Sequence, residues 1–502
     1  MKDYVLAIDQ GTTGTTVSVF DRDGRVRGKG YAELPQHYPK PGWVEHDPEQ
    51  IWSTVLAAVN AAMEQASVDA VDLAAVGVTN QRETTVLWER ETGLPVHNAI
   101  VWQCRRTADE CDRIAASGAA DTIRAKTGLV VDAYFSATKV KWLLEHVPGL
   151  LDRARRGEIC FGTVDSWLLW KLSGGAVHAT DVSNASRTML FNIHTLDWDS
   201  DLLSLFGVYP DMLPPVVPSS GVIGETSDRY GAPAGIPIAG VAGDQQAALF
   251  GQGCFAPGDV KCTYGTGAFV LMNTGDQPVQ TKHGLLSTVA WMVGGKPTYA
   301  LEGSVFICGA AVQWLRDGLG LISSAAETEG LAASVPDTGG VYFVPAFVGL
   351  GAPYWNPHAR GLITGLTRGT TKAHIVRAAL EAMAYQVHDL LAEMRREFRA
   401  DISSIRADGG AAANNWLMQF QADILGIPVL RPQNIETTAT GAAALAGIAV
   451  GFWRSGEELG GIGFRDRFSP RMDQRERDAL LDGWRRAVET ANNPSLGGNA
   501  SR

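Results

Sequence analysis

A strand, a Gly-Thr turn and a returning strand occur twice in this chain, about half a chain apart. The first copy covers residues 4–20 and has its turn in Asp9-Gln-Gly-Thr-Thr-Gly-Thr-Thr16. The second covers residues 258–272 and has the turn Gly265-Thr-Gly267. Alternating helices and buried strands follow the hairpin in each half. Because a repeat of this size is typical of duplication, the pattern predicts an α/β protein built from two similar halves.

The length of the chain supports more than one packed core. It has 502 residues, of which 45% are hydrophobic and 19% are charged, and a single core stops growing at about 250–300 residues. We expect an N-terminal domain over residues 1–252 and a C-terminal domain over residues 253–491. Residues 492–502 are predicted to be a disordered tail.

Charge and cysteine usage limit the classes of partner and compartment. The net charge of −11 disfavours binding to nucleic acid, which requires clustered Lys and Arg, so a small-molecule partner is expected. The six cysteines include no CxxC pair, which favours reduced thiols over a disulfide framework or a zinc site. The N-terminus runs directly into a strand without a signal sequence, which predicts a cytoplasmic protein. The most apolar segment, residues 441–453, is too short to insert across a membrane, which takes about 20 residues, and is interpreted as a buried helix.

Asp244 stands almost at the midpoint of the chain, inside the apolar run Gly240-Val-Ala-Gly-Asp-Gln-Gln246. A carboxylate in such surroundings needs a partner or a chemical role. The alternative interpretation is that Asp244 is the N-cap of a helix, because the residues that follow it favour a helix start.

The two turns have the composition of a phosphate site. Gly11 and Gly14 let the turn expose its N–H groups, and the threonine hydroxyls add further donors. Two opposed turns of this kind would hold a polyphosphate from both sides, with Asp9 placed to attend a metal ion. A plain hairpin turn is the alternative for the first copy.

Further polar and aromatic residues follow predicted strands in the first half. Arg82 and Glu83 place a forked donor beside an acceptor, which suits the alternating hydroxyls of a polyol; a surface ion pair is the alternative. Trp102 would supply an apolar wall for a small carbon skeleton, although such aromatic residues often belong to a core. Tyr134 precedes a helix predicted to start at Ser136.

The second half contains features that suit a nucleotide. Gly409 and Gly410 follow a strand, and their missing side chains let a flat ring approach the backbone before a helix that starts at Asn414. Gly309 and Gln313 share a helix face at i, i+4 spacing. A purely structural glycine turn remains the alternative at residues 409–410.

Taken together, these motifs resemble those of the FGGY family of carbohydrate kinases over nearly the whole chain. The matching stretches are Asp9-Gln-Gly-Thr-Thr13, Pro41-Gly-Trp-Val-Glu-His-Asp47, Asn80-Gln-Arg-Glu-Thr-Thr85, Tyr134-x-Ser-x-x-Lys139, Gly243-Asp-Gln-Gln246, Thr263-Tyr-Gly-Thr-Gly267, Gly361 to Glu381 and Asp408-Gly-Gly-Ala-Ala-Ala-Asn-Asn415. The resemblance implies two actin-like (ribonuclease-H-like) domains with a catalytic cleft between them. It also implies ATP-dependent phosphorylation of glycerol with Mg²⁺, ATP being held mostly by the second domain and glycerol mostly by the first.

The resemblance assigns roles position by position. It implies that glycerol hydroxyls are held by Arg82, Glu83, Tyr134, Asp244 and Gln245, and that its carbons lie between Trp102 and Phe269. It places the phosphate path along Thr12, Thr13, Gly14 and Thr266, and the nucleoside at Gly309, Gln313, Gly410 and Asn414. Asp244 would be the general base, and Asp9 with Asp244 would hold Mg²⁺. A homo-oligomer, either a dimer or a tetramer, is also expected.

Some positions depart from the pattern of the family. Thr16 and Cys104 stand where many members have Arg and Asp, and residues 228–231 and 234–238 lack the histidine and the arginine through which some members are regulated. Two other functions were weighed: a kinase for another small polyol or keto-sugar, and a nucleotide-binding actin-like sensor or scaffold without turnover. Intact Asp9 and Asp244 favour catalysis.

Overall fold

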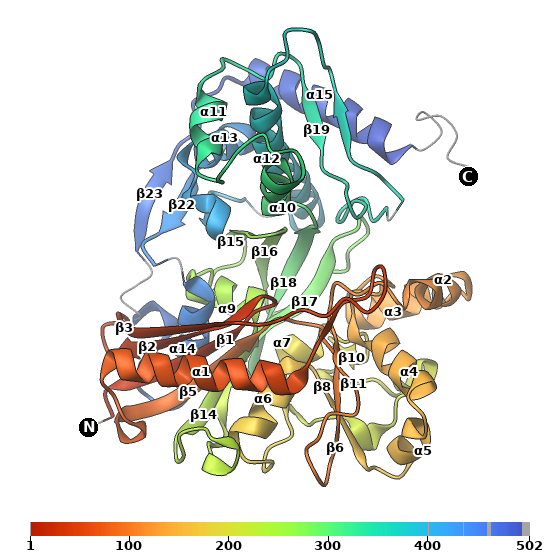
Figure 1. The fold of residues 1–502 in the computed structure, drawn as a ribbon, viewed down its shortest axis with the longest axis vertical. Helices are drawn as coiled ribbons and strands as arrows, with labels where there is room; N and C mark the ends of the chain where they lie inside the picture. Colours follow the sequence, from red (N-terminus) through yellow and green to blue (C-terminus); the bar gives the residue numbers. More distant parts are fainter. Residues whose placement is uncertain (1, 357, 400, 435, 459–462, 494–502) are drawn as a thin grey trace.

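The computed structural model describes residues 2–356, 358–399, 401–434, 436–458 and 463–493. Figure 1 shows the first half of the chain, in red to yellow, stacked against the second half, in green to blue. A mixed sheet of thirteen strands runs through both halves in the order β23-β22-β21-β15-β16-β18-β17-β13-β14-β5-β1-β2-β3. The predicted α/β class is therefore confirmed.

Each half contributes the same arrangement of five strands. In both, three antiparallel strands are followed by two strands parallel to the first one. The first half supplies β1 (Tyr4–Gln10), β2 (Gly14–Asp21), β3 (Val26–Glu33), β5 (Leu73–Asn80) and β14 (Pro237–Gly243). The second half supplies β15 (Val260–Tyr264), β16 (Ala268–Gly275), β18 (Lys296–Val305), β21 (Ile405–Asp408) and β22 (Val429–Pro432). This repeated topology confirms the duplication that the two Gly-Thr hairpins predict.

Three further strands complete the sheet, namely β13 (Ser220–Glu225), β17 (Leu286–Val293) and β23 (Phe464–Phe468). The two halves of the sheet meet where β13 pairs with β17, and that pairing consists of Ser220 and Val293 alone. The large sheet is thus continuous, but its halves are joined by a narrow seam.

Helices pack on the sheet in both halves of the chain. The longer helices of the first half are α1 (Pro48–Ala66), α2 (Ala108–Ala116), α3 (Ala120–Thr127), α4 (Ser136–His146), α6 (Val164–Leu172) and α8 (Ser200–Phe206), with the shorter α5 (Leu150–Arg155) and α7 (Val182–Ala185). The second half has α10 (Gly309–Gln313), α11 (Glu327–Ala333), α12 (Lys372–Phe398), α13 (Asn415–Leu425), α14 (Thr437–Ala449) and α15 (Gln474–Asn492). In the described parts of the chain, none of the helices combines the length and the apolarity of a membrane span.

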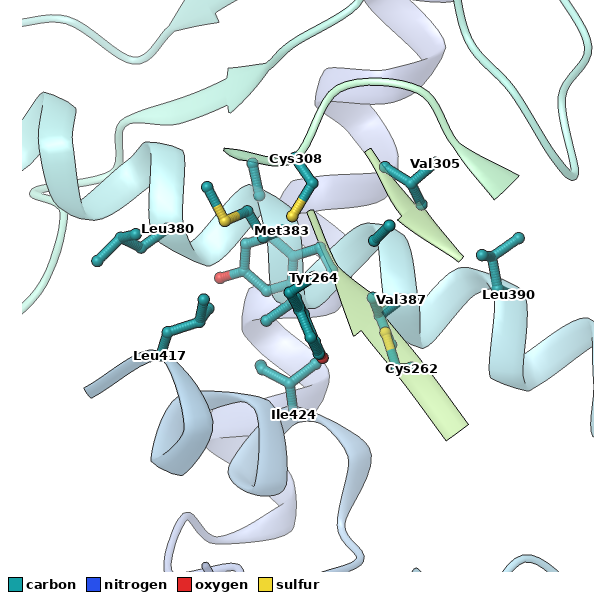
Figure 2. Close-up of a cluster of buried hydrophobic side chains, with 14 of the residues drawn as sticks. Cys262, Tyr264, Val305, Cys308, Leu380, Met383, Val387, Leu390, Leu417 and Ile424 are labelled. Carbon is teal, nitrogen blue, oxygen red and sulfur yellow. The ribbon is translucent and has the colours of Figure 1, made fainter. Parts of the chain in front are cut away.

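Helix α12 forms the centre of the core of the second half. Its side chains Leu380, Met383, Val387 and Leu390 lie between strands β15 and β18 on one side and α13 on the other (Figure 2). Tyr264 is fully buried there, and its hydroxyl donates a hydrogen bond to Gln421 Oε1 at 2.6 Å. This packing fixes the end of β15, from which the second Gly-Thr turn projects.

Helix α14, although it belongs to the second half of the sequence, packs on the sheet of the first half. In Figure 1 this blue helix lies among the red and orange strands. A Cβ atom on Gly77 of β5 would lie 2.2 Å from the carbonyl oxygen of Ala442, and one on Gly240 of β14 would lie 2.4 Å from the amide nitrogen of Ala446. The small residues of the predicted buried helix are therefore required for close backbone contact. The proposed boundary at residues 252 and 253 stays a prediction, because this helix joins both halves in one apolar cluster.

Aspartate side chains cap the first and the last of the long helices. Asp47 accepts a hydrogen bond from the amide of Glu49 at the start of α1, and Asp473 accepts one from Glu476 at the start of α15. Helix α15 ends at Asn492, and residues 494–502 of the predicted tail lie outside the described residues. All six cysteines are buried and free of disulfides.

Candidate active site

Three parallel strands of the first half end at the same edge of the sheet. Gln10, near the end of β1, pairs with Asn80 at the end of β5, and Asn80 pairs with Gly243 at the end of β14. Asp9, Arg82 and Asp244 each lie within two residues of these positions. The sheet register thus brings together residues that lie far apart in the sequence of the N-terminal half.

Asp244 is the first residue of helix α9 (Asp244–Gly251), and the N-cap is Gly243. The interpretation of Asp244 as a capping residue is therefore wrong. Its Oδ1 atom lies 3.1 Å from Arg82 Nε, and its side chain keeps 27% of its surface exposed. Burial raises the pKa of this carboxyl group, although Arg82 and Lys261 oppose the shift. A half-buried carboxylate of this kind is suited to accept a proton.

Arg82 and Glu83 belong to a buried cluster of four charged side chains. Arg82 Nη1 lies 2.5 Å from Glu302 Oε2, Arg187 Nη2 lies 2.9 Å from Glu302 Oε1, and Arg187 Nε lies 2.6 Å from Glu83 Oε1. The side chains of Arg82 and Glu83 are 2% and 1% exposed, so the interpretation as a surface ion pair is wrong. Burial alone would raise the pKa of Glu302, but Arg187 and Arg82 outweigh it and lower the pKa to about 2. Glu302 is therefore ionised between the two arginines, whereas at Glu83 burial outweighs Arg187 and Arg82 and raises the pKa.

Sequence reasoning missed Arg187 and Glu302. A signal existed for Glu302, because it is the only charged residue between positions 297 and 315, in the middle of a buried strand. An isolated charge in an apolar strand requires a partner. Arg187, in contrast, ends a polar loop after α7, and nothing in its local sequence distinguishes it from a surface arginine.

The backbone of Glu83 has a φ of +61°, which is unusual for a residue with a side chain. Its carbonyl oxygen accepts a hydrogen bond from Ser136 Oγ at 3.0 Å, and its carboxylate is held by Arg187. Strained backbone persists where the surroundings over-determine it, and such positions cluster at active sites. Ser136 at the start of α4 thus links Glu83 to the segment that carries Tyr134.

The predicted aromatic residues Trp102, Tyr134 and Phe269 lie together. The ring centroids of Trp102 and Phe269 are 6.2 Å apart at an interplanar angle of 75°, and those of Trp102 and Tyr134 are 5.6 Å apart. Trp102 Nε1 donates to Thr12 Oγ1 at 2.9 Å. Because the rings of Trp102 and Phe269 meet edge to face, a carbon skeleton can lie between them only after one ring moves.

Each of the two Gly-Thr turns is closed by a backbone hydrogen bond between two glycines. Gly11 N–H donates to the carbonyl of Gly14, and Gly265 N–H donates to that of Gly267, both at 2.9 Å. Thr13 and Thr266 are exposed at the turns, and Thr12 is half-buried. Gly14 is needed for packing, since a Cβ atom there would lie 2.6 Å from the hydroxyl of Tyr31.

A cavity of about 570 Å³ in the second half contains all five residues expected there, namely Thr266, Gly309, Gln313, Gly410 and Asn414. A Cβ atom on Gly309 would lie 2.6 Å from the carbonyl of Gly265, whereas one on Gly410 would meet nothing within 4 Å. Asn414 accepts a hydrogen bond from the amide of Leu417, which caps α13. Gly410 therefore leaves open space in this cavity for a flat group. Arg316 and Glu329 also line it and were missed by sequence reasoning.

Asp9 and Asp244 act on each other electrostatically. Burial, together with the negative charge of Asp244, raises the pKa of Asp9 from 3.8 to about 8. Paired carboxylates of this kind are hard oxygen ligands and fit a divalent cation such as Mg²⁺, which relieves their repulsion. Among the described residues, no group of three or more His, Cys, Asp or Glu side chains is placed to hold a metal ion. Any cation here would need further oxygen ligands from phosphate or water.

Comparison with known families covers both halves. The N-terminal domain of the FGGY family of carbohydrate kinases matches residues 4–251, and the C-terminal domain of the same family matches residues 260–450. The chain belongs to the FGGY family of carbohydrate kinases. Membership confirms the two-domain fold that the motifs imply, and it confirms a phosphotransferase with an alcohol acceptor.

Several relatives of this FGGY kinase align over almost their entire length. A glycerol kinase of Carboxydothermus hydrogenoformans is 60% identical, with 98% of each chain covered. Glycerol kinase 2 of Thermotoga maritima is 58% identical over 97% of this chain and 98% of its own. The crystal structure of Plasmodium falciparum glycerol kinase with ADP superimposes with a TM-score of 0.90 at 35% identity, covering 97% of this chain and 98% of that chain.

Proposed function

We propose that this FGGY kinase transfers the γ-phosphoryl group of ATP to glycerol, forming sn-glycerol 3-phosphate and ADP. The observation that carries the proposal is the position of Asp244, a half-buried carboxylate next to Arg82 at the edge where β1, β5 and β14 end. Glycerol as the acceptor is supported by relatives named glycerol kinase at 58–60% identity.

Asp244 is the proposed general base. In-line phosphoryl transfer depends mostly on positioning and charge neutralisation, while a base takes the proton of the attacking hydroxyl. Arg82 holds Asp244 from one side, and the buried Glu302 holds Arg82. Glu83, Tyr134 and Gln245 would bind the glycerol hydroxyls, with Trp102 and Phe269 against its carbons.

The nucleotide would occupy the cavity at Gly309, Gln313, Gly410 and Asn414, with its phosphates directed along Thr266 and the turn of Thr12, Thr13 and Gly14. Asp9 and Asp244 would hold Mg²⁺, which when bound neutralises charge on the phosphates. Burial and the charge of Asp244 raise the pKa of Asp9, and a cation bound beside it would oppose that shift by favouring the ionised carboxylate.

A kinase for a larger polyol or a keto-sugar is the second candidate. The chain also superimposes on xylulose kinase from Rhodospirillum rubrum with a TM-score of 0.85 at 25% identity. The 6.2 Å contact between the rings of Trp102 and Phe269 favours the smaller acceptor, because a sugar would need a wider opening there. Membership of the FGGY kinase family disfavours the remaining alternative, a sensor without turnover, for which no ADP release is expected with any polyol.

The test is ADP release from Mg-ATP by purified protein with and without glycerol. We expect release that depends on glycerol, and a fall of about 10²–10⁴-fold in the Asp244→Asn variant while ATP still binds. Asp228→Asn, at an exposed position, is the matched control. Stimulation by another polyol but not by glycerol would refute the proposed acceptor, and full activity of Asp244→Asn would refute the base.

We also infer a cytoplasmic protein that assembles as a dimer or tetramer. The six buried cysteines, free of disulfides, suit a reducing compartment. The assembly state stays a prediction, which light scattering of the purified protein will test; a monomer at micromolar concentration would contradict it.

A further inference from the structure

Lys261 is a buried lysine that the roles described so far do not use. It lies in β15 with 0% of its surface exposed. Its Nζ atom donates hydrogen bonds to Gln245 Oε1 and to Thr263 Oγ1, the latter at 2.9 Å. Burial lowers the pKa of Lys261, although the carboxylates of Asp408 and Asp244 act in the opposite direction, and among the described residues it forms no ion pair with a carboxylate. A buried amino group whose hydrogen-bond partners are both neutral needs an explanation.

The contact fixes which way the amide of Gln245 faces. Lys261 Nζ donates to Oε1 of Gln245, so the oxygen of the amide is the atom that faces Lys261. The Nε2 group is thereby turned away from Lys261, and within the described part of the chain it donates no hydrogen bond. Gln245 directly follows Asp244 and is 8% exposed. An unpaired donor thus stands next to the proposed base.

We propose that Lys261 is a positioning residue that makes Gln245 a hydrogen-bond donor to the substrate. This inference rests on the proposed function. Asp244 then accepts a proton from one hydroxyl while Gln245 donates to a lone pair of another. A hydroxyl group satisfies either role, whereas an ammonium group can only donate and would face the amide N–H atoms of Gln245. The pair Lys261 and Gln245 therefore selects neutral polyols over amino-polyols of the same size.

The test compares glycerol with 2-amino-1,3-propanediol and 3-amino-1,2-propanediol, which between them replace each hydroxyl by an amine that is protonated at pH 7. We expect the wild-type protein to prefer glycerol. In Lys261→Met the amide is free to rotate, so the ratio of kcat/KM for glycerol to that for the better amine should fall by at least about tenfold, mainly through KM. Lys296→Met, which removes an exposed lysine at the start of strand β18, should leave the ratio unchanged.

A second variant keeps the test decisive if Lys261→Met does not fold. Gln245→Glu preserves the contact with Lys261 but presents an acceptor oxygen in place of the amide donor. We expect its preference to shift toward an amino-polyol by at least about tenfold relative to wild type. A glycerol preference that is unchanged in Gln245→Glu, or in a folded Lys261→Met, overturns the inference while leaving the proposed function intact. Absence of glycerol turnover in the wild type overturns both.

Discussion

Arg82 and Glu302 form a two-point ion pair that joins the two halves of the molecule. Nη1 lies 2.5 Å from Oε2 and Nη2 lies 3.1 Å from Oε1, although the residues are 220 positions apart in sequence. The side chains are 2% and 0% exposed. The desolvation of two charges offsets much of their attraction, so such a pair is better explained by position than by stability. Here it fixes the guanidinium whose Nε atom reaches Asp244.

Replacing Glu302 by Gln tests this interpretation. The variant leaves Arg82 and Arg187 buried without a carboxylate between them, so we expect the free energy of unfolding to fall by about 3–5 kcal/mol. We also expect kcat/KM for glycerol to fall, because Arg82 would no longer be held next to Asp244. Denaturant unfolding and steady-state kinetics measure the two effects. Glu225→Gln, at an exposed position of β13, is the control, and equal stability of the two variants would contradict the interpretation.

Replacing Gly410 by Leu tests the nucleotide cavity. A Cβ atom at this position meets nothing within 4 Å, so the added side chain would fill space in the cavity without disturbing the fold. We expect an unchanged melting temperature and a Kd for ATP raised at least about tenfold by isothermal titration calorimetry. Gly221→Leu, in β13 and also facing open space, should bind ATP normally. Wild-type ATP affinity in Gly410→Leu would exclude this cavity as the nucleoside site.

Glycerol binding should change the environment of Trp102. Its ring meets Phe269 edge to face at 6.2 Å, and a ligand between them must displace one of the rings. We expect a glycerol-dependent change in tryptophan fluorescence that disappears in Trp102→Phe. The chain has 14 tryptophans, and the others contribute a background that glycerol does not change. Trp43→Phe, which alters a tryptophan that meets the ring of Trp142 edge to face, should retain the signal. A signal that survives in Trp102→Phe would place the carbons of glycerol elsewhere.

A buried carboxyl group away from the site should make stability depend on pH. Asp165 is fully buried, and burial, reinforced by Asp181, raises its pKa from 3.8 to about 7. Between these values the unfolded chain releases the proton while the folded protein keeps it, so stability falls as pH rises from about 4 to 7. We expect Asp165→Asn to gain stability relative to wild type by an amount of order 2–4 kcal/mol between pH 4 and pH 8.

Urea unfolding at both pH values measures that difference. The exposed substitution Asp228→Asn should track the wild type at each pH. A constant difference between Asp165→Asn and wild type across this range would show that Asp165 is ionised in the folded protein throughout.

Local sequence determined those parts of this protein that depend on neighbours in the chain. The hairpin turns at residues 11–14 and 265–267 and the helix starts at Ser136 and Asn414 follow from glycine placement and from local helix-start signals. The motifs also pointed to the five residues that the nucleotide cavity brings together. Backbone preference and hydrogen bonding act over a few residues, so a single sequence displays them.

Only the tertiary structure decided the surroundings of the site. Arg82 was equally compatible with a surface ion pair until Glu302 and Arg187 were placed around it, and the contact of Lys261 with Gln245 joins strand β15 of the second half to helix α9. Helix α14 crosses to the sheet of the first half because its small residues allow backbone contact with Gly77 and Gly240. These outcomes depend on burial and on pairings between residues far apart in the chain, whose free energy is set by the completed fold and leaves little trace in local sequence.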